Sequence, residues 1–317
     1  MKESDEFFVL QKYFKNLGSQ YNDSSGILIG PGDDAGLFST QKKKTDLIFS
    51  TDVSTSGIHF PKNLEPELIA YRSCCIAASD IPACGGTLKW LSISLVTPSK
   101  ELNWLKKFAQ GIRLFTKNYQ TPIIGGDLVK GKECSVSVGV CGEVNQKQFL
   151  SRSGAKAGDS IYVSGTLGLA KLGLNLIEAK KKDLNSIEKK FLKKFLQPKV
   201  HTLLGQSLRN IANSCIDISD GLIGDLGHIC QQSNCGAELN IDSIPCEGSY
   251  EDALTWGDDY ELCFTVPKNK DKKLTEICRE KKIKIYKIGE VTNGTSIKIY
   301  QGNKEVTFKS KSYNHLT

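Results

Sequence analysis

The sequence predicts an α+β protein of two domains. Its 317 residues exceed the usual size of a single domain, so that length alone favours two. Apolar residues make up 39% of the chain and charged residues 24%, which allows each domain to bury a core of its own. Strand-like and helical segments are mixed without a strict strand–helix–strand repeat. This mixture favours α+β halves over a doubly wound parallel sheet.

The first half of the chain predicts helices over 5–17, 65–78 and 102–119, and Pro66 suits the first turn of the second of these. Short apolar or alternating stretches predict strands at 26–32, 47–52, 90–96, 122–124 and 135–144.

A turn-rich segment at 152–159 separates the two halves, and we therefore divide the chain into domains 1–147 and 148–317. The second half predicts strands at 160–164, 215–218, 237–242, 260–266, 284–289 and 296–300. Its helices are expected at 166–180, 187–196, 200–213, 222–233 and 270–281.

Composition excludes several classes of function. The net charge is +7, but the lysines stand in short runs typical of solvated loops and helix faces, so no nucleic-acid partner is expected. Apolar runs are too short to span a membrane, and the acidic start of the chain has no signal-peptide pattern, so we expect a cytoplasmic protein without a membrane partner. The 11 cysteines include no Cys-x-x-Cys pair and are expected to be reduced core residues.

The most informative pattern is a series of acidic turns that follow apolar strands. Any single Asp in a turn can be a local backbone cap. Their repetition beside Gly, Ser and Thr instead favours hard-oxygen ligands for Mg²⁺, which proteins commonly hold together with substrate phosphates. The turns are Gly32-Asp33-Asp34, Ser50-Thr51-Asp52, Ser79-Asp80, Gly125-Gly126-Asp127, Asp217-Ile-Ser-Asp220 and Gly257-Asp258-Asp259.

Familiar catalytic motifs are absent from the sequence. It contains no P-loop, no protein-kinase motif set and no Gly-x-Ser-x-Gly elbow, and it has only 4 His. The segment Gly30–Gly36 is similar to a dinucleotide fingerprint, but its third Gly comes one residue late and its two acids would repel a pyrophosphate.

A series of motifs in fixed order resembles the thiamine-monophosphate kinase family, of the aminoimidazole ribonucleotide synthetase superfamily. The resemblance covers nearly the whole chain, from about residue 5 to residue 315. The motifs are Gly30-Pro-Gly-Asp-Asp-Ala35, Ser50-Thr-Asp-Val53, Gly57-Ile-His-Phe60, Ser79-Asp80, Gly125-Gly-Asp127, Arg152-Ser-Gly-Ala-Lys-Ala-Gly-Asp159, Asp217-Ile-Ser-Asp-Gly-Leu222 and Asp259-Tyr-Glu-Leu262.

This resemblance implies transfer of the ATP γ-phosphoryl group to thiamine monophosphate, with several Mg²⁺ ions in a cleft. It implies a two-domain α+β fold in which the first domain binds ATP and Mg²⁺ and forms a homodimer through its strands, while the second completes the cleft. No acid or base catalyst is assigned, because the acceptor phosphate is already an anion near neutral pH.

The resemblance also implies roles for individual residues. The expected metal ligands are Asp34, Ser50, Thr51, Asp52, Asp80, Asp127, Asp217 and Asp220. The expected nucleotide contacts are Gly126, Asp127, Arg152 and Ser219, and the expected substrate contacts are His59, Asp258 and Tyr313. Simpler roles stay open: Arg152 as a capping residue, His59 as a packed side chain and Tyr313 as an anchor of the chain end.

The chain departs from the family pattern in three places. Asp258 stands where the family has Glu, so a direct substrate contact could become water-mediated. Ala77 replaces an Asn, and Pro82-Ala-Cys84 replaces Ala-Ala-Met, with Pro82 expected to reshape the start of a helix. The alternatives are a related ATP-using enzyme with another acceptor and a catalytically silent Mg-nucleotide module. Retention of every candidate ligand speaks against the silent module.

Overall fold

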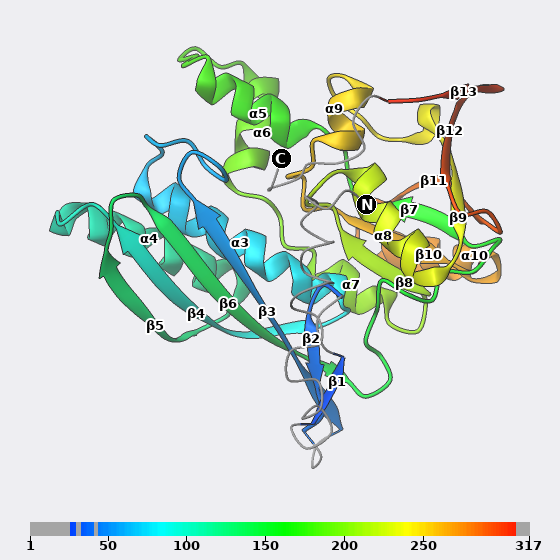
Figure 1. Cartoon of the computed structure of the whole chain (residues 1–317), viewed down its shortest axis with the longest axis horizontal. Helices are drawn as coiled ribbons and strands as arrows, with labels where there is room; N and C mark the ends of the chain where they lie inside the picture. The colour runs from blue at the N-terminus through cyan, green and yellow to red at the C-terminus, as the bar shows by residue number, and fades with distance from the viewer. Residues whose placement is uncertain (1–25, 30–32, 41–43, 309–317) are drawn as a thin grey trace.

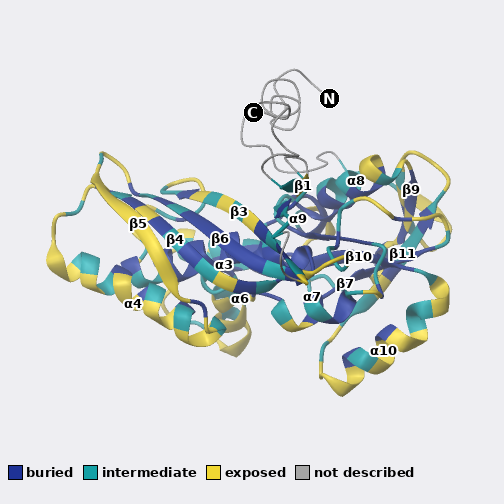
Figure 2. Ribbon diagram, turned by 90° about the horizontal axis from the view of Figure 1, so that it is seen from below, coloured by how far each residue is buried: buried dark blue, intermediate teal, exposed yellow. Residues whose placement is uncertain are grey.

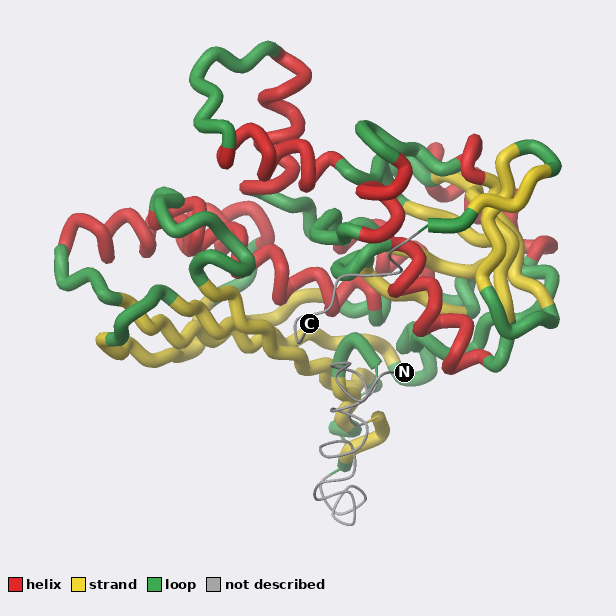
Figure 3. Tube along the Cα trace, turned by 45° about the horizontal axis from the view of Figure 1, so that its top comes forward, coloured by secondary structure: helices red, strands yellow, loops and turns green. Residues whose placement is uncertain are grey.

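A computed structural model describes residues 26–29, 33–40 and 44–308, and the helix expected at 5–17 and Tyr313 lie outside these residues. The predicted α+β fold is confirmed. The described chain forms a six-stranded and a seven-stranded sheet, each flanked by helices (Figures 1 and 3).

The N-terminal sheet has the strand order β1-β2-β3-β6-β4-β5. Its neighbours pair antiparallel except β4 and β5, which are parallel. The longest pairing joins β3 to β6 over the whole length of both strands. The strands are β1 (Ile27–Ile29), β2 (Gly36–Phe38), β3 (Thr45–Thr55), β4 (Thr87–Thr97), β5 (Ile123–Lys130) and β6 (Ser135–Asn145).

Two helices, α3 (Pro66–Ala83) and α4 (Leu102–Tyr119), lie on one side of this sheet (Figure 1). Helix α3 is buried on nearly all sides, and its apolar residues lie all around the helix. Strand β5 is exposed at every residue (Figure 2). One face of the sheet is therefore packed and the other is open.

The C-terminal sheet has the order β13-β12-β9-β11-β7-β10-β8 and one parallel pair, β9 with β12. Apolar side chains of β7 alternate between two cores, since Ile161 and Val163 face one and Tyr162 the other. The strands are β7 (Ser160–Val163), β8 (Ser214–Asp217), β9 (Gly236–Asn240), β10 (Leu262–Val266), β11 (Tyr286–Thr292), β12 (Ile297–Gln301) and β13 (Lys304–Val306).

Helices cover both faces of this second sheet. Helices α8 and α9 pack on one core, and α7 and α10 on the other. Among the described helices, none combines the length and the apolar character that crossing a bilayer demands. The helices are α5 (Leu169–Glu178), α6 (Ser186–Leu196), α7 (Thr202–Leu208), α8 (Leu222–Ser233), α9 (Tyr250–Thr255) and α10 (Asp271–Glu280), with short 3₁₀ turns η3 (Ile241–Ser243) and η4 (Lys268–Lys270).

The end of α3 is the point at which the two domains meet. A Cβ atom on Gly205 of α7 would lie 2.2 Å from the carbonyl oxygen of Pro82, so the two helices touch backbone to backbone. Beyond this contact, Arg209 donates through Nε to the carbonyl of Gly85 at 2.5 Å and through Nη2 to Thr87 at 3.0 Å. The residues of α3 near Pro82 are thereby fixed relative to both domains.

Several sequence expectations were wrong in detail. Asp52 lies inside β3 and Asp127 inside β5 rather than in turns, and Asp80 lies in α3. Pro82 lies in the last turn of α3 and not at the start of a helix. The expected strand and helix ended too early, at polar residues. Pairing with β6 extends β3 past its apolar segment, and burial at the domain junction extends α3.

The backbone contact at Gly205 predicts that Gly205→Ala destabilises the protein by about 1–3 kcal/mol, since a helix or a domain has to shift to admit the methyl group. Gly227→Ala in α8 is the matched control, because a Cβ there would meet nothing within 4 Å and should stabilise the helix by up to about 1 kcal/mol. Urea unfolding of both variants measures the difference. Equal stability of the two would contradict the close domain contact.

Candidate active site

Three carboxylates from separate parts of the chain converge between the domains. One oxygen each from Asp34, Asp80 and Asp217 lies within 4.8 Å of the other two. Asp34 precedes β2, Asp80 lies near the end of α3 and Asp217 ends β8 of the second domain. The fold thus assembles the group from both domains, through the contact that α3 makes with α7 and β8.

Strand β3 adds two more of the expected ligands. Side chains alternate along a strand, so Ser50 and Asp52 share the inner face with the buried Ile48. Ser50 Oγ donates to Asp80 Oδ2 at 2.5 Å, and Asp52 lies close enough to Asp80 and Asp217 for their charges to interact. We define the carboxylate cluster as Asp34, Asp52, Asp80 and Asp217.

Burial and mutual repulsion raise the pKa values across the carboxylate cluster. Burial, opposed by Arg152 and reinforced by Asp217 and Asp33, raises the pKa of Asp34 to about 8. The pKa of Asp52 rises to about 6 for the same main reason, and those of Asp80 and Asp217 are also raised by burial. At neutral pH the cluster therefore holds protons unless a cation replaces them.

Among the described residues, Arg152 is the cationic side chain that donates hydrogen bonds to the carboxylate cluster. Its Nε donates to Asp34 Oδ1 at 2.7 Å, and its Nη2 donates to the same oxygen. Asp33, which is not among the expected metal ligands, holds the turn that carries Arg152. It accepts from Ser151 Oγ at 2.5 Å and from the Arg152 backbone N–H at 3.1 Å.

The donor set fits a hard divalent cation. Asp34 Oδ2 is buried and has no hydrogen-bond partner among the described residues, although Oδ1 of the same group is paired with Arg152. An unpaired buried carboxylate oxygen is costly unless a ligand or proton satisfies it. With the oxygens of Asp80 and Asp217 beside it, this atom fits Mg²⁺ coordination.

The turn after β8 borders the cluster and contacts a second turn. Asp258 N–H donates to the Ser219 carbonyl at 2.7 Å, and a Cβ on Gly257 would lie 2.1 Å from that same oxygen. Asp220 N–H donates to Asp225 Oδ2 at 3.1 Å. Asp225 is buried in α8 and was missed, since a single Asp within a helical pattern gives no sequence signal.

The expected substrate residues His59 and Asp258 come from different domains. His59 Nδ1 accepts the Thr55 backbone N–H at 3.1 Å, which places its ring proton on Nε2. Asp258 has a left-handed backbone, φ 63°, and pairs with Arg72. A backbone of this kind in a non-Gly residue persists only where its surroundings fix it.

Three expected site residues are not brought to the cluster in this structure. Register places Asp127 beside Ser94 of β4, and through β6 in line with Val53 on the open face of the sheet. Thr51 lies on this open face as well, and Gly126 lies on the exposed strand β5. Their roles as ligands or nucleotide contacts stay predictions.

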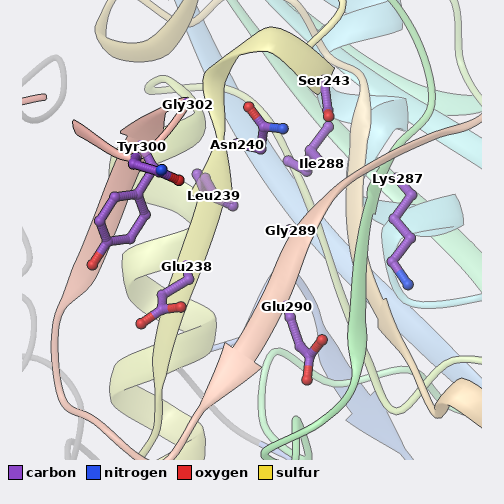
Figure 4. A pocket seen from close by; sticks show the side chains of 11 residues that line it. Glu238, Leu239, Asn240, Ser243, Lys287, Ile288, Gly289, Glu290, Tyr300 and Gly302 are labelled. Atoms are coloured by element: carbon purple, nitrogen blue, oxygen red, sulfur yellow. The ribbon is translucent and has the colours of Figure 1, made fainter. Parts of the chain in front are cut away.

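A separate hollow of about 670 Å³ lies on the second sheet between β9, β11 and β12 (Figure 4). Its lining includes Glu238, Lys287 and Tyr300 and none of the expected site residues. The candidate active site is therefore the carboxylate cluster at the domain junction.

The chain is similar to known proteins in both of its halves. The family of AIR synthase related proteins matches through its N-terminal domain over residues 32–144 and through its C-terminal domain over residues 156–302. The thiamine-monophosphate kinase of Buchnera aphidicola subsp. Schizaphis graminum is 38% identical over 99% of both chains. The thiamine-monophosphate kinase of Escherichia coli K12 is 38% identical over 83% of this chain and 82% of its own.

A solved structure is also similar to this chain over nearly its whole length. The protein described as AaThiL complexed with AMPPCP and TMP superposes with a TM-score of 0.83 at 29% identity, covering 99% of this chain and 98% of its own.

The raised pKa values predict how pH and Mg²⁺ affect stability. A carboxyl group whose pKa is about 8 in the folded chain, against 3.8 otherwise, loses its stabilising contribution as the pH rises through 8. In a chelator the melting temperature should fall between pH 6 and pH 8, and Mg²⁺ should raise it more at pH 8, by about 3 °C or more.

Asp80→Asn should raise the melting temperature in chelator and remove the Mg²⁺ response, since it takes one charge out of the cluster. Asp183→Asn, which changes an exposed carboxylate, is the control and should behave as wild type. Thermal melts with and without Mg²⁺ at both pH values test this, and a Mg²⁺ response in Asp80→Asn equal to that of wild type would contradict it.

Proposed function

The chain is an enzyme of the thiamine-monophosphate kinase family, and on that premise we propose that it transfers the γ-phosphoryl group of ATP to thiamine monophosphate, forming thiamine diphosphate and ADP. The observation that carries this proposal is the convergence of Asp34, Asp80 and Asp217 at the domain junction. A buried group of carboxylates with an unpaired oxygen is the expected arrangement for holding a metal-bound triphosphate.

The physical difficulty of this reaction is the approach of two anions. The acceptor phosphate, with a second pKa of ~6, needs no base to remove a proton. Two unit charges 4 Å apart repel by ~4 kcal/mol at an effective dielectric constant of ~20, and several such pairs have to meet. Charge neutralisation and alignment, not acid–base chemistry, are therefore what the site has to provide.

Several Mg²⁺ ions, when bound, would supply the positive charge that an in-line transfer between two phosphates requires. The carboxylate cluster, with Ser50 and Asp220, is proposed to hold them. Arg152 adds a fixed positive charge at the edge of the cluster, where Asp34 orients its guanidinium and Asp33 holds its backbone N–H. Ser219 borders the same cleft from the second domain, and His59 and Asp258 are proposed to receive the acceptor.

The open face of the N-terminal sheet supports the proposed homodimer. Phe49, Val53 and Val129 expose 43%, 51% and 48% of their surface, and β5 is an unpaired edge strand. Open apolar sheet faces and edges are usually covered by another chain. Asp127, Gly126 and Thr51 belong to this region, so a second copy would change the surroundings of the expected residues that this chain alone leaves apart from the cluster.

The proposed reaction predicts that the purified protein, given ATP, Mg²⁺ and thiamine monophosphate, forms thiamine diphosphate and ADP in equal amounts and that a chelator stops both. Product analysis by chromatography measures this. ADP without thiamine diphosphate would point to another acceptor, and nucleotide binding without turnover would point to a silent module.

Asp52→Asn and Asp80→Asn should each reduce turnover by about 10³-fold or more while the fold is kept, because each removes a charge that the metal site needs. Circular dichroism checks the fold, and Asp183→Asn, at an exposed position, is again the control. Turnover at the wild-type level in either cluster variant would argue against the metal role.

The dimer predicts a mass in solution of twice 34.9 kDa. Val129→Glu on β5 should shift the protein towards the monomer mass, because a charge there would be buried between two copies. Ile187→Glu, which alters an exposed apolar residue on α6, should leave the mass unchanged. Sedimentation equilibrium measures all three, and a monomeric wild type would overturn the dimer.

A further inference from the structure

Arg72 is a charged side chain in the interior of the protein. It lies on α3 with 2% of its surface exposed, and it is among the largest fully buried side chains of the described residues. A guanidinium is tolerated in such a place only when its donors and its charge are met by fixed partners.

Each nitrogen of the Arg72 guanidinium has an acceptor on a different segment. Nε donates to the His59 carbonyl at 3.2 Å, Nη1 donates to the Phe195 carbonyl, and Nη2 donates to Asp258 Oδ1 at 2.5 Å. The carbon at the centre of the guanidinium also lies 4.0 Å from the centroid of the Phe195 ring. This planar fork is therefore held in one orientation.

The segments that Arg72 joins are those that carry the expected acceptor contacts. His59 follows β3 of the first domain, and Asp258 lies in the turn before β10 of the second. Asp258 is held further by a side-chain hydrogen bond with Tyr260, and its N–H is bonded to Ser219. Arg72 thus bonds to both segments at once, so its guanidinium helps to fix the separation of His59 and Asp258.

We propose that Arg72 is a positioning residue for the phosphoryl acceptor: it sets the separation of His59 and Asp258 across the domain junction and so determines affinity for thiamine monophosphate. This inference depends on the proposed function. Asp258 is shorter by one methylene than the Glu of the family pattern, and its pairing with Arg72 fixes where that shorter carboxylate lies.

Among the described residues, Arg72 does not contact those that are proposed to bind Mg-ATP, and this separation makes its role testable. Within the described residues, the bonds of Arg72 go to His59, Phe195 and Asp258, and none goes to the carboxylate cluster or to Arg152. Loss of the fork should therefore weaken binding of the acceptor and spare binding of Mg-ATP.

The test is steady-state kinetics of Arg72→Lys, which keeps the charge but loses the planar fork. The KM for thiamine monophosphate should rise by about tenfold or more, while the KM for ATP stays within about twofold. Arg209→Lys is the matched control, since Arg209 also joins the domains but contacts Gly85 and Thr87. It should leave the KM for thiamine monophosphate unchanged.

A second variant keeps the proposal testable if Arg72→Lys does not fold. Asp258→Asn leaves Arg72 in place and weakens one of its bonds, and it should raise the KM for thiamine monophosphate alone. Combined with Arg72→Lys, it should add little to the effect of the stronger single change, because the two residues act as one unit.

Several results would overturn the inference. They are an unchanged KM for thiamine monophosphate in Arg72→Lys or Asp258→Asn, an equal rise in both KM values, and a matching rise in Arg209→Lys. A wild-type protein that forms no thiamine diphosphate would instead overturn the proposed function, and this inference with it.

Discussion

The structure depends on the cost of holding like charges together away from water. The carboxylate cluster collects negative charge in a buried place where one guanidinium, that of Arg152, opposes it. Strand alternation places Asp52 on the inner face of the sheet, and helix α3 places Asp80 beside it. Protons or a cation are then the available means of neutralisation, and a site that binds metal-bound phosphates makes use of this requirement.

Helix α3 links the carboxylate cluster to the packing of both domains. It packs in the first domain against α4 and the sheet, and its last turns contact α7 and β8 of the second. Asp80 and Asp217 meet because this helix reaches the second domain, and the close approach at Gly205 sets how near it can come. The site and the domain interface are therefore the same packing arrangement.

The two sides of the junction treat buried charge differently. The charge of Arg72 is matched by Asp258, and its other nitrogens donate to backbone carbonyls. No described residue gives Asp34 Oδ2 a hydrogen bond. A satisfied buried ion pair orders structure, whereas an unsatisfied carboxylate attracts a ligand. This difference underlies the distinction between Arg72, the proposed positioning residue, and the proposed metal ligands.

The α+β class and the family could be predicted from the sequence alone, because motif order and apolar patterns are local features of the chain. The sequence also placed Asp34, Asp80 and Asp217 in one metal group, through the family resemblance. Tertiary structure alone decided that Asp52 faces the cluster while Thr51 and Asp127 face outward, since the face of a strand depends on its pairing partners. The roles of Asp33, Asp225 and Arg72 were likewise invisible, because each acts on residues brought near by the fold, and a buried charge acquires its meaning only from the partners that folding places around it.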